Sequence, residues 1–265
     1  MRYGLIGEKL GHSYSKLIHE KLADYRYDLI PLSEEEFITF MTEKNFTAIN
    51  VTIPYKQKVI PYLDELHPLA AQIGAVNTIV NKDGYCTGYN TDFYGFQYML
   101  LNNNIEVAGK KCLILGTGGT SHTVRAVLKH LCASKVLIVS RKDSSNSDLN
   151  DINTTISYET CYQIHTDAEI IINTTPLGMY PRVDASPLDL SDFRDCKAVV
   201  DVIFNPMKTK LSLQAEELGI KAVTGLEMLV AQAKQAIEYF LDTKLKDACI
   251  EKVYQELVEI IRNKI

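Results

Sequence analysis

Four short stretches in the N-terminal part of the chain carry polar side chains that could bind a small substrate and move a proton. A lysine that lies beside a carboxylate can donate and accept a proton during catalysis. Hydroxyl and amide groups around such a pair would suit a small polyhydroxylated substrate. The stretches are HSYSK, NVTIPYK, GAVNT and GYNTD, and the side chains in question are Ser13, Ser15, Thr52, Lys56, Asn77 and Asp92.

Lys56 is the least expected of these residues, because it follows a strand-like run that meets Pro54. The fixed φ of proline suits the first residue of a helix, so the sequence predicts a helix that begins at Pro54 with Lys56 in its first turn. The positive end of a helix dipole opposes an ammonium group at that place. A lysine with a purely structural role would be better placed at the other helix end, which favours a functional role for Lys56.

Each of these polar residues also has a structural interpretation. Ser15 and Asp92 could cap helices, Asn77 could form a turn, and Lys56 could be a solvated surface lysine. It is the combination of hydroxyls, one amide, one lysine and one carboxylate that favours a binding site.

The surrounding pattern predicts the elements that must position these side chains. Strands are expected at residues 3–6, 26–32, 46–53 and 75–81, with helices at 15–25 and 33–45; Ser33 and Glu36 form a capping box at the start of the second helix. Alternating strands and helices favour a mostly parallel sheet. Ligands of such sheets bind beyond the carboxyl ends of the strands, where Ser13, Thr52, Lys56 and Asp92 are expected to lie.

A second alternating set begins near Lys110, with short apolar runs that are typical of strands covered on both faces. The first run, KKCLIL, leads into LGTGGT and a helix, so Gly116, Gly118 and Gly119 form a glycine turn between strand and helix. Such a turn lets backbone N–H groups and a helix N-terminus approach a pyrophosphate. Ser121 stands where the third glycine of the G-x-G-x-x-G pattern would be, and a plain strand–turn–helix link is the alternative.

The residues after the next strand bear on the choice of dinucleotide. KVLIVS ends at Ser140 and is followed by Arg141, Lys142 and Asp143. Basic side chains at this place pair with the 2′-phosphate of NADP, whereas an acidic one holds the ribose of NAD. The two basic residues favour NADP over NAD. Asp143 has the opposite effect, because a carboxylate there binds the ribose hydroxyls or repels the phosphate.

Bulk composition excludes several other classes of function. The 265 residues carry a net charge of −5 without a block of like charges, which predicts no nucleic-acid partner. No apolar run could span a bilayer and no signal peptide is apparent, so we expect no membrane partner and a cytoplasmic location. The six cysteines form no C-x-x-C pair, which predicts reduced thiols and no metal site.

Taken in order, HSYSK, NVTIPYK, GAVNT, GYNTD, LGTGGT, INTTPLGM and GLEMLVAQA resemble the shikimate dehydrogenase family over nearly the whole chain. The resemblance implies reversible reduction of 3-dehydroshikimate to shikimate with NADPH, a step in chorismate and aromatic amino-acid biosynthesis. It implies Lys56 as the acid/base residue paired with Asp92. The substrate carboxylate would be held by Ser13 and Ser15, and the ring hydroxyls by Thr52, Asn77, Asp92 and Gln232.

The resemblance also implies a two-domain α/β fold. Residues 1–92 and 227–265 would form a substrate domain with a mostly parallel sheet, and residues 93–226 a Rossmann-like NADP-binding domain. The C-terminal helices, expected at 226–241 and 247–263, would return to the first domain; from the residues alone they could equally close the second. A monomer or a homodimer is expected. Cofactor contacts are assigned to Gly116, Thr117, Gly118, Gly119, Thr120, Ser140, Arg141, Lys142, Asn173, Thr174, Val202 and Gly225.

Two departures from the family pattern bear on specificity. Phe204 stands where the family usually has a substrate-binding tyrosine, and a lost hydrogen bond to a charged group is worth roughly 1.5–3 kcal/mol. Ser140-Arg141-Lys142 replaces the usual Asn-Arg-Thr, which keeps the arginine and weakens the preference for NADP. Two alternatives follow: a quinate/shikimate dehydrogenase that uses NAD(P), and a catalytically silent nucleotide-binding homologue.

Overall fold

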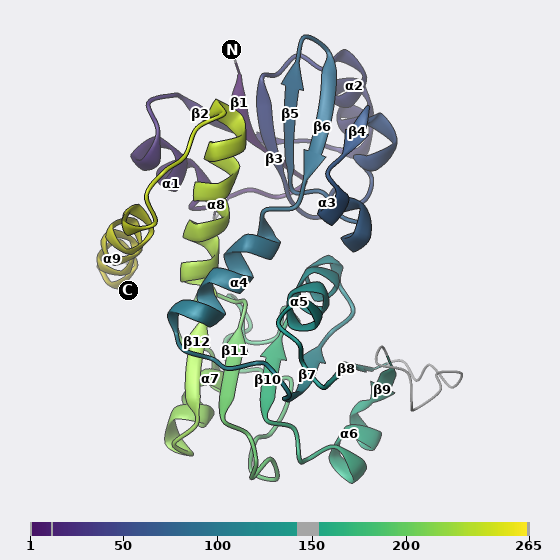
Figure 1. The fold of residues 1–265 in the computed structure, drawn as a ribbon. Helices are drawn as coiled ribbons and strands as arrows, with labels where there is room; N and C mark the ends of the chain where they lie inside the picture. Colours follow the sequence, from purple (N-terminus) through teal and green to yellow (C-terminus); the bar gives the residue numbers. More distant parts are fainter. Residues whose placement is uncertain (1, 12, 142–153, 264–265) are drawn as a thin grey trace. The chain divides into compact units, whose positions relative to one another are not determined.

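The computed structural model describes residues 2–11, 13–141 and 154–263. It divides into two compact units, one of Met1–Gly95 with Leu229–Ile265 and the other of Phe96–Met228. Each unit is built around one six-stranded sheet with helices on its faces (Figure 1). This confirms the predicted α/β class with mostly parallel sheets.

The sheet of the first unit has the strand order β2-β1-β3-β5-β6-β4. Strand β1 is parallel to β2 and β3, whereas β5 is antiparallel to both of its neighbours. The elements of this unit are β1 (Tyr3–Gly7), α1 (Ser15–Leu22), β2 (Tyr27–Pro31), α2 (Glu34–Glu43), β3 (Ala48–Val51), a 3-10 turn η1 (Ile60–Tyr62), β4 (Glu65–Leu66), α3 (Pro68–Ile73), β5 (Thr78–Lys82), β6 (Tyr85–Tyr89), most of α8 (Leu226–Leu241) and α9 (Ala248–Arg262).

The antiparallel strand β5 decides which residues share an edge of this sheet. Asn50 near the end of β3 is paired with Thr78 at the start of β5, and Thr78 is paired with Tyr89 at the end of β6. The residues just before β5 and just after β6 therefore lie at the edge where β1 and β3 end. Strand β6 was not predicted, although Asp83-Gly84 is a dipeptide typical of hairpin turns. In the structure both residues have positive φ and form the tight turn between β5 and β6.

Helices cover both faces of the first sheet, because successive strand residues point to opposite faces. Ile6 of β1 packs with Phe37 and Met41 of α2 and with Ala70 of α3. Leu5 belongs to the core on the other face, which Ala236 and Phe240 of α8 help to form. The predicted capping box is confirmed at the start of α2, where the Ser33 and Glu36 side chains each accept the other residue's backbone N–H.

The helix predicted from Pro54 does not form, so Lys56 does not lie in the first turn of an α-helix. The segment is a series of turns in which the N–H groups of Tyr55 and Ile60 donate to the carbonyls of Thr52 and Gln57, three residues back. The carbonyl of Lys56, which an α-helix would pair with Ile60, instead accepts the N–H of Val76 at 2.8 Å. A contact with the neighbouring strand region has therefore replaced the intrahelical bond, and no helix dipole acts on Lys56.

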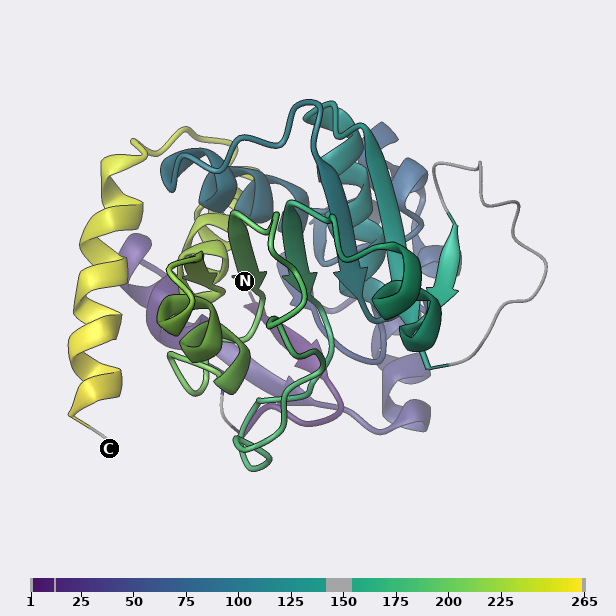
Figure 2. The same cartoon turned by 90° about the horizontal axis from the view of Figure 1, so that it is seen from below.

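The C-terminal helices belong to the first unit, as predicted. Helix α9 lies beside α1 in both views (Figure 1, Figure 2), and Lys21 forms an ion pair with Glu256 between them. Phe240 of α8 stacks on Tyr3 of β1, with 5.7 Å between ring centroids.

The sheet of the second unit is entirely parallel and has the order β12-β11-β10-β7-β8-β9. This is the doubly wound dinucleotide-binding arrangement, in which the strand order reverses between β7 and β10. The sequence analysis missed only its short edge strand, β9. The elements are most of α4 (Asp92–Asn102), β7 (Lys111–Leu115), α5 (Gly119–His130), β8 (Lys135–Ser140), β9 (Thr155–Ser157), α6 (Tyr158–Ile164), β10 (Ile170–Asn173), β11 (Ala198–Asp201), α7 (Lys210–Glu217) and β12 (Lys221–Thr224).

Alternate residues of the central strands also separate the two faces of this second sheet. Leu113 and Val199 pack with Cys161 of α6 and with Leu211 and Ala215 of α7. Helix α5 contacts β7 and β8. Across residues 2–11, 13–141 and 154–263, none of the helices combines the length and the apolar character that crossing a bilayer needs.

His19 of α1 is a fully buried imidazole in the first unit. Its Nδ1 lies 2.7 Å from the hydroxyl of Tyr25, and its ring stacks on Tyr27 with 4.0 Å between centroids. Desolvation lowers the pKa of His19 from 6.5 to about 3. As the pH falls below 6.5, the unfolded chain binds a proton that the folded chain excludes. The stability that neutral His19 contributes is therefore complete above pH 6.5 and is lost progressively as the pH falls towards 3.

We expect this loss to appear as a difference between variants. Between pH 7 and pH 5, the free energy of unfolding of the wild type should fall by about 2 kcal/mol more than that of His19→Gln. Urea unfolding at the two pH values measures it, and His130→Gln, at an exposed helix-end histidine, serves as the control. Equal pH dependence in wild type and His19→Gln would contradict this interpretation.

Candidate active site

The centre of the candidate site is an ion pair between Lys56 and Asp92. The Lys56 Nζ lies 2.6 Å from Asp92 Oδ2, and the two side chains are 18% and 11% exposed. Lys56 comes from the turns after β3, and Asp92 is the first residue of α4. The amine and the carboxyl group are therefore in contact, in a largely water-excluded position.

Main-chain hydrogen bonds hold the lysine in this place. The Lys56 carbonyl accepts the N–H of Val76 at 2.8 Å, and the N–H of Val51 donates to the carbonyl of Asn77 at 2.8 Å. The N–H of Asn77 in turn donates to the carbonyl of Tyr89 at 3.0 Å. The turn that carries Lys56 is thereby tied to the strand edge from which Asn77 and Asp92 project.

The carboxamide of Asn77 has a defined orientation, because its oxygen must face hydrogen-bond donors. Asn77 Oδ1 accepts the backbone N–H of Thr91 at 2.7 Å and lies 3.1 Å from the hydroxyl of Thr78. Its Nδ2 lies 3.0 Å from Thr91 Oγ1. The amide oxygen is thus occupied within the protein, so Asn77 can offer a ligand an N–H donor.

A buried chain of polar groups supports Asn77 from inside the unit. The hydroxyl of Tyr27 donates to Asn50 Oδ1 at 2.7 Å. The amide of Asn50 then donates to Thr78 Oγ1 at 3.0 Å and to the carbonyl of Asn77 at 3.2 Å. Tyr27 is fully buried and Asn50 nearly so. These groups fix the position of Asn77 without reaching a ligand themselves.

Two further residues connect the helices to this network. Gln232 of α8 places Oε1 at 3.4 Å from Thr91 Oγ1, and its Nε2 donates to the carbonyl of Leu229 at 2.9 Å. Asn90 accepts the N–H of Phe93 at 3.2 Å at the start of α4. Helix α4 is therefore anchored immediately beside Asp92.

The predicted residues Ser13, Ser15 and Thr52 lie at the same edge of the sheet. Ser13 lies in the connection between β1 and α1, where its Oγ accepts the N–H of Ser15, the first residue of α1, at 3.2 Å; Thr52 directly follows β3. A Cβ on Gly7 would stand 2.5 Å from the Thr52 methyl group and 2.9 Å from a Leu10 methyl group, so glycine leaves room for these side chains. Among the described residues, no hydrogen bond joins Ser13 or Ser15 to Lys56. Phe204 follows β11 in the second unit.

The second unit contains a cavity of about 560 Å³ at the carboxyl ends of its strands, within the usual range for ligand sites. Gly116 makes the turn out of β7 with φ 103°, and a Cβ there would stand 3.0 Å from the Thr175 methyl group. Of the predicted cofactor residues, this cavity is lined by Gly116, Thr117, Gly118, Ser140, Arg141 and Thr174.

The remaining predicted cofactor residues lie elsewhere. Gly119 and Thr120 form the first turn of α5, and Asn173 is fully buried at the end of β10. The backbone at Gly225 packs directly against that at Val202, since a Cβ on Gly225 would stand 2.1 Å from the Val202 carbonyl oxygen. Lys142 lies outside the described residues.

Sequence reasoning missed several residues that line this cavity, and Arg182 matters most. Arg182 follows β10 at a distance in the chain and lines the same cavity as Arg141. The signal that could have found it is positional, because the segment after β10 borders the point where the strand order reverses. The other missed residues are Val139, Tyr158, Thr175, Pro176, Leu177 and Pro187.

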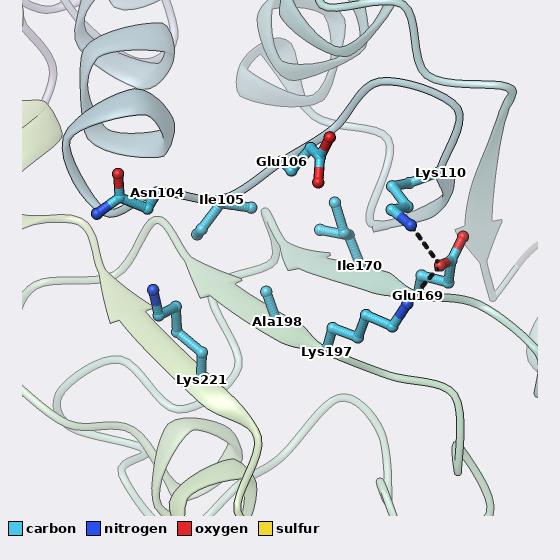
Figure 3. A pocket seen from close by; sticks show the side chains of 9 residues that line it. All are labelled: Asn104, Ile105, Glu106, Lys110, Glu169, Ile170, Lys197, Ala198 and Lys221. Atoms are coloured by element: carbon cyan, nitrogen blue, oxygen red, sulfur yellow. Dashed lines mark hydrogen bonds and ion pairs between the residues drawn. The ribbon is translucent and has the colours of Figure 1, made fainter.

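A smaller cavity of about 260 Å³ lies at the opposite edge of this sheet, where β10, β11 and β12 begin (Figure 3). Glu169 accepts hydrogen bonds from Lys110 at 3.0 Å and from Lys197 at 3.1 Å, and these bonds lower the pKa of its carboxyl group. Lys221 donates to the carbonyl of Asn103 at 2.7 Å. The charged side chains of this smaller cavity that are named above are thus paired with other groups of the protein. Ligands of doubly wound sheets bind at the other edge. The cavity lined by Arg141 is therefore the candidate cofactor site.

Known proteins resemble the chain over nearly its whole length. A family model described as the shikimate dehydrogenase substrate binding domain matches residues 5–79. The shikimate dehydrogenase (NADP(+)) of Clostridium perfringens (strain SM101 / Type A) is 38% identical over 96% of this chain and 97% of its own length. A solved structure of shikimate dehydrogenase 1 from Peptoclostridium difficile is 36% identical, with a TM-score of 0.88 over 97% of this chain and 98% of that one. A solved chorismate mutase/shikimate 5-dehydrogenase fusion protein from Clostridium acetobutylicum is 37% identical, with a TM-score of 0.90 over 98% of each chain.

The buried chain beneath Asn77 generates a prediction about stability. Tyr27→Phe removes the donor to Asn50 and leaves a buried amide oxygen unsatisfied, so the free energy of unfolding should fall by about 1–3 kcal/mol. Chemical denaturation measures this change. Tyr85→Phe, at an exposed tyrosine of β6, is the control and should stay close to the wild type. A Tyr27→Phe protein as stable as the control would show that the bond has no net effect.

Proposed function

Because the chain belongs to the shikimate dehydrogenase family, we propose that it catalyses the reversible, NADPH-dependent reduction of 3-dehydroshikimate to shikimate. The observation that carries this proposal is the Lys56–Asp92 ion pair of 2.6 Å beside the oriented amide of Asn77. A silent nucleotide-binding homologue would have no need of a largely buried amine and carboxylate in contact at the end of a sheet.

Lys56 is the proton donor in this mechanism. When bound, NADPH supplies a hydride to the carbonyl carbon, and negative charge develops on the carbonyl oxygen. The Lys56 ammonium gives its proton to that oxygen, and in the reverse direction neutral Lys56 takes the proton from the hydroxyl. Asp92 holds the amine in place and, through its second oxygen, can accept a hydrogen bond from a substrate hydroxyl.

The other polar residues at this sheet edge bind the rest of the substrate. Asn77 donates an N–H to a ring oxygen, because its own oxygen is occupied by Thr91. Thr52 and Gln232 complete the contacts with the ring hydroxyls. Ser13, before α1, and Ser15, at its first residue, hold the carboxylate. Residues 1–92 and 227–265 would thus form the substrate domain.

The cavity of the second unit fits a phosphorylated dinucleotide. Its glycine turn and the N-terminus of α5 suit a pyrophosphate. Arg141 and Arg182 line the same cavity, and guanidinium groups bind phosphate in a bidentate manner. These features support NADP rather than NAD as the cofactor. Residues 93–226 would form the cofactor domain.

A substrate panel tests the proposed function. Purified protein is mixed with shikimate or quinate and with NADP⁺ or NAD⁺, and formation of the reduced cofactor is followed by absorbance. The proposal predicts the highest kcat/KM with shikimate and NADP⁺. Turnover of quinate alone, or cofactor binding without turnover of either acid, would overturn it. Phe204 makes quinate the informative competitor, since the family's usual tyrosine is absent there.

Replacing the proposed proton donor gives a quantitative prediction. Lys56→Ala should lower kcat by about 10²–10⁴-fold, the usual contribution of a positioned acid/base group. Steady-state assays measure kcat, and circular dichroism checks the fold. Lys58→Ala is the matched control, because Lys58 lies two residues further on and is an exposed partner of Glu34. Near-normal turnover by Lys56→Ala would remove Lys56 from the mechanism.

A further inference from the structure

Asp201, at the end of β11, is a buried carboxyl group without a cationic partner. It is fully buried, and no described lysine, arginine or histidine forms an ion pair with it. Its oxygens accept hydrogen bonds from Ile203 N at 3.0 Å, from the Thr209 hydroxyl at 2.7 Å, and from Asn173 Nδ2 at 3.1 Å to each oxygen. Burial without a counter-charge is unfavourable, and this desolvation raises the pKa of Asp201.

Asn173 connects Asp201 by hydrogen bonds to the segment that follows β10. A carboxylate can only accept, so the Asn173 amide must turn its NH₂ group towards Asp201. Its oxygen then faces the other way and accepts both the N–H of Thr175 at 2.9 Å and the hydroxyl of Thr175 at 2.7 Å. The hydroxyl oxygen of Thr175 accepts the N–H of Leu177 at 3.2 Å. Asp201 therefore fixes the orientation of the Asn173 amide, which in turn holds Thr175 and, through a second Nδ2 hydrogen bond of 3.3 Å, the carbonyl of Leu177.

This segment forms a wall of the dinucleotide cavity. Thr175, Pro176 and Leu177 all line it, whereas Asp201 and Asn173 do not. The Thr175 methyl group also packs against the glycine turn, where a Cβ on Gly116 would stand 3.0 Å away. The position of Thr175 therefore contributes to the spacing between the wall and the turn, together with the bonds from Thr174 to the carbonyl of Leu115.

The order of the strands indicates which half of the cofactor meets this wall. The glycine turn follows β7, and the residues expected at the adenosine ribose, Ser140 and Arg141, follow β8 on one side of it. Strand β10 lies on the other side of β7, across the point where the order reverses. A dinucleotide that extends across this point places its nicotinamide half against residues 174–177.

We propose that Asp201 is a positioning residue for the nicotinamide half of the cofactor, acting through Asn173 on the wall formed by Thr175 and Leu177. The proposal rests on the proposed function, because it requires that the cavity binds NADP. It gives Asn173 a role different from the direct cofactor contact expected from the sequence.

Two ligands separate positioning from general support of the fold. NADP⁺ has both halves, whereas 2′,5′-ADP has only the adenosine half. Because Asn173 Nδ2 lies 3.1 Å from each Asp201 oxygen, Asp201→Asn sets an NH₂ group against the Asn173 NH₂ in either orientation of the new amide, which should displace the wall. We expect the Kd for NADP⁺ to rise about tenfold or more, as for loss of a charge-assisted hydrogen bond, while the Kd for 2′,5′-ADP stays within about twofold.

A reciprocal exchange provides the rescue. Asn173→Asp alone opposes two carboxylates and should also weaken NADP⁺ binding. In the double variant Asp201→Asn/Asn173→Asp, the amide of residue 201 can donate to the carboxylate of residue 173, which still accepts both groups of Thr175. We expect this variant to recover most of the affinity for NADP⁺, a pattern that independent losses would not give.

Titration calorimetry on the whole chain distinguishes the outcomes. Asp195→Asn, at an exposed aspartate of the same unit, removes the same charge and should bind both ligands as the wild type does. Equal weakening of both ligands, unchanged NADP⁺ affinity in Asp201→Asn, or additive losses in the double variant would each overturn the positioning role. If Asp201→Asn fails to fold, the comparison of the double variant with the wild type decides. Failure of the wild type to bind NADP⁺ would refute the proposed function itself.

Discussion

The contact between Lys56 and Asp92 is the interaction on which the candidate site of the first unit depends. Two largely buried charged groups are stabilised only when each is held against the other with good geometry. The lysine comes from a series of turns tied to the sheet through its own carbonyl, and the aspartate begins a helix whose start is capped by Asn90. Both anchors lie at one edge because β5 runs antiparallel to β3, so that the ends of β3 and β6 coincide.

Behind each candidate site, a buried amide orients a group at the site. In the first unit Asn50 supports Asn77, and in the second unit Asn173 supports Thr175. An amide has a donor end and an acceptor end, so one fixed neighbour determines its whole orientation. This lets residues distant from a ligand specify which hydrogen-bonding atom a site presents, at the expense of buried polar groups that must all be satisfied.

The sequence predicted most of the fold because its signals are local. Continuous apolar runs identified five of the six strands of the second unit's sheet, and Ser33 with Glu36 marked the start of α2. The missed strand β6 had a local signal in Asp83-Gly84, whereas two other errors concern long-range contacts. Pro54 suggests a helix, but the Lys56 carbonyl accepts the N–H of Val76, a residue from another segment. Arg182 was not predicted as a site residue, because only folding brings it to the cavity that Arg141 also lines. The Lys56–Asp92 contact itself was expected through the family resemblance, since spacing alone does not specify it.

A double-mutant cycle on kcat tests the central claim most directly. If Lys56 and Asp92 act as one unit, the double variant Lys56→Ala/Asp92→Asn should turn over no more slowly than Lys56→Ala, because the carboxylate no longer has an amine to position. The account would be contradicted if the two losses of kcat multiplied. The double variant would then be slower than Lys56→Ala by the same factor by which Asp92→Asn alone is slower than the wild type.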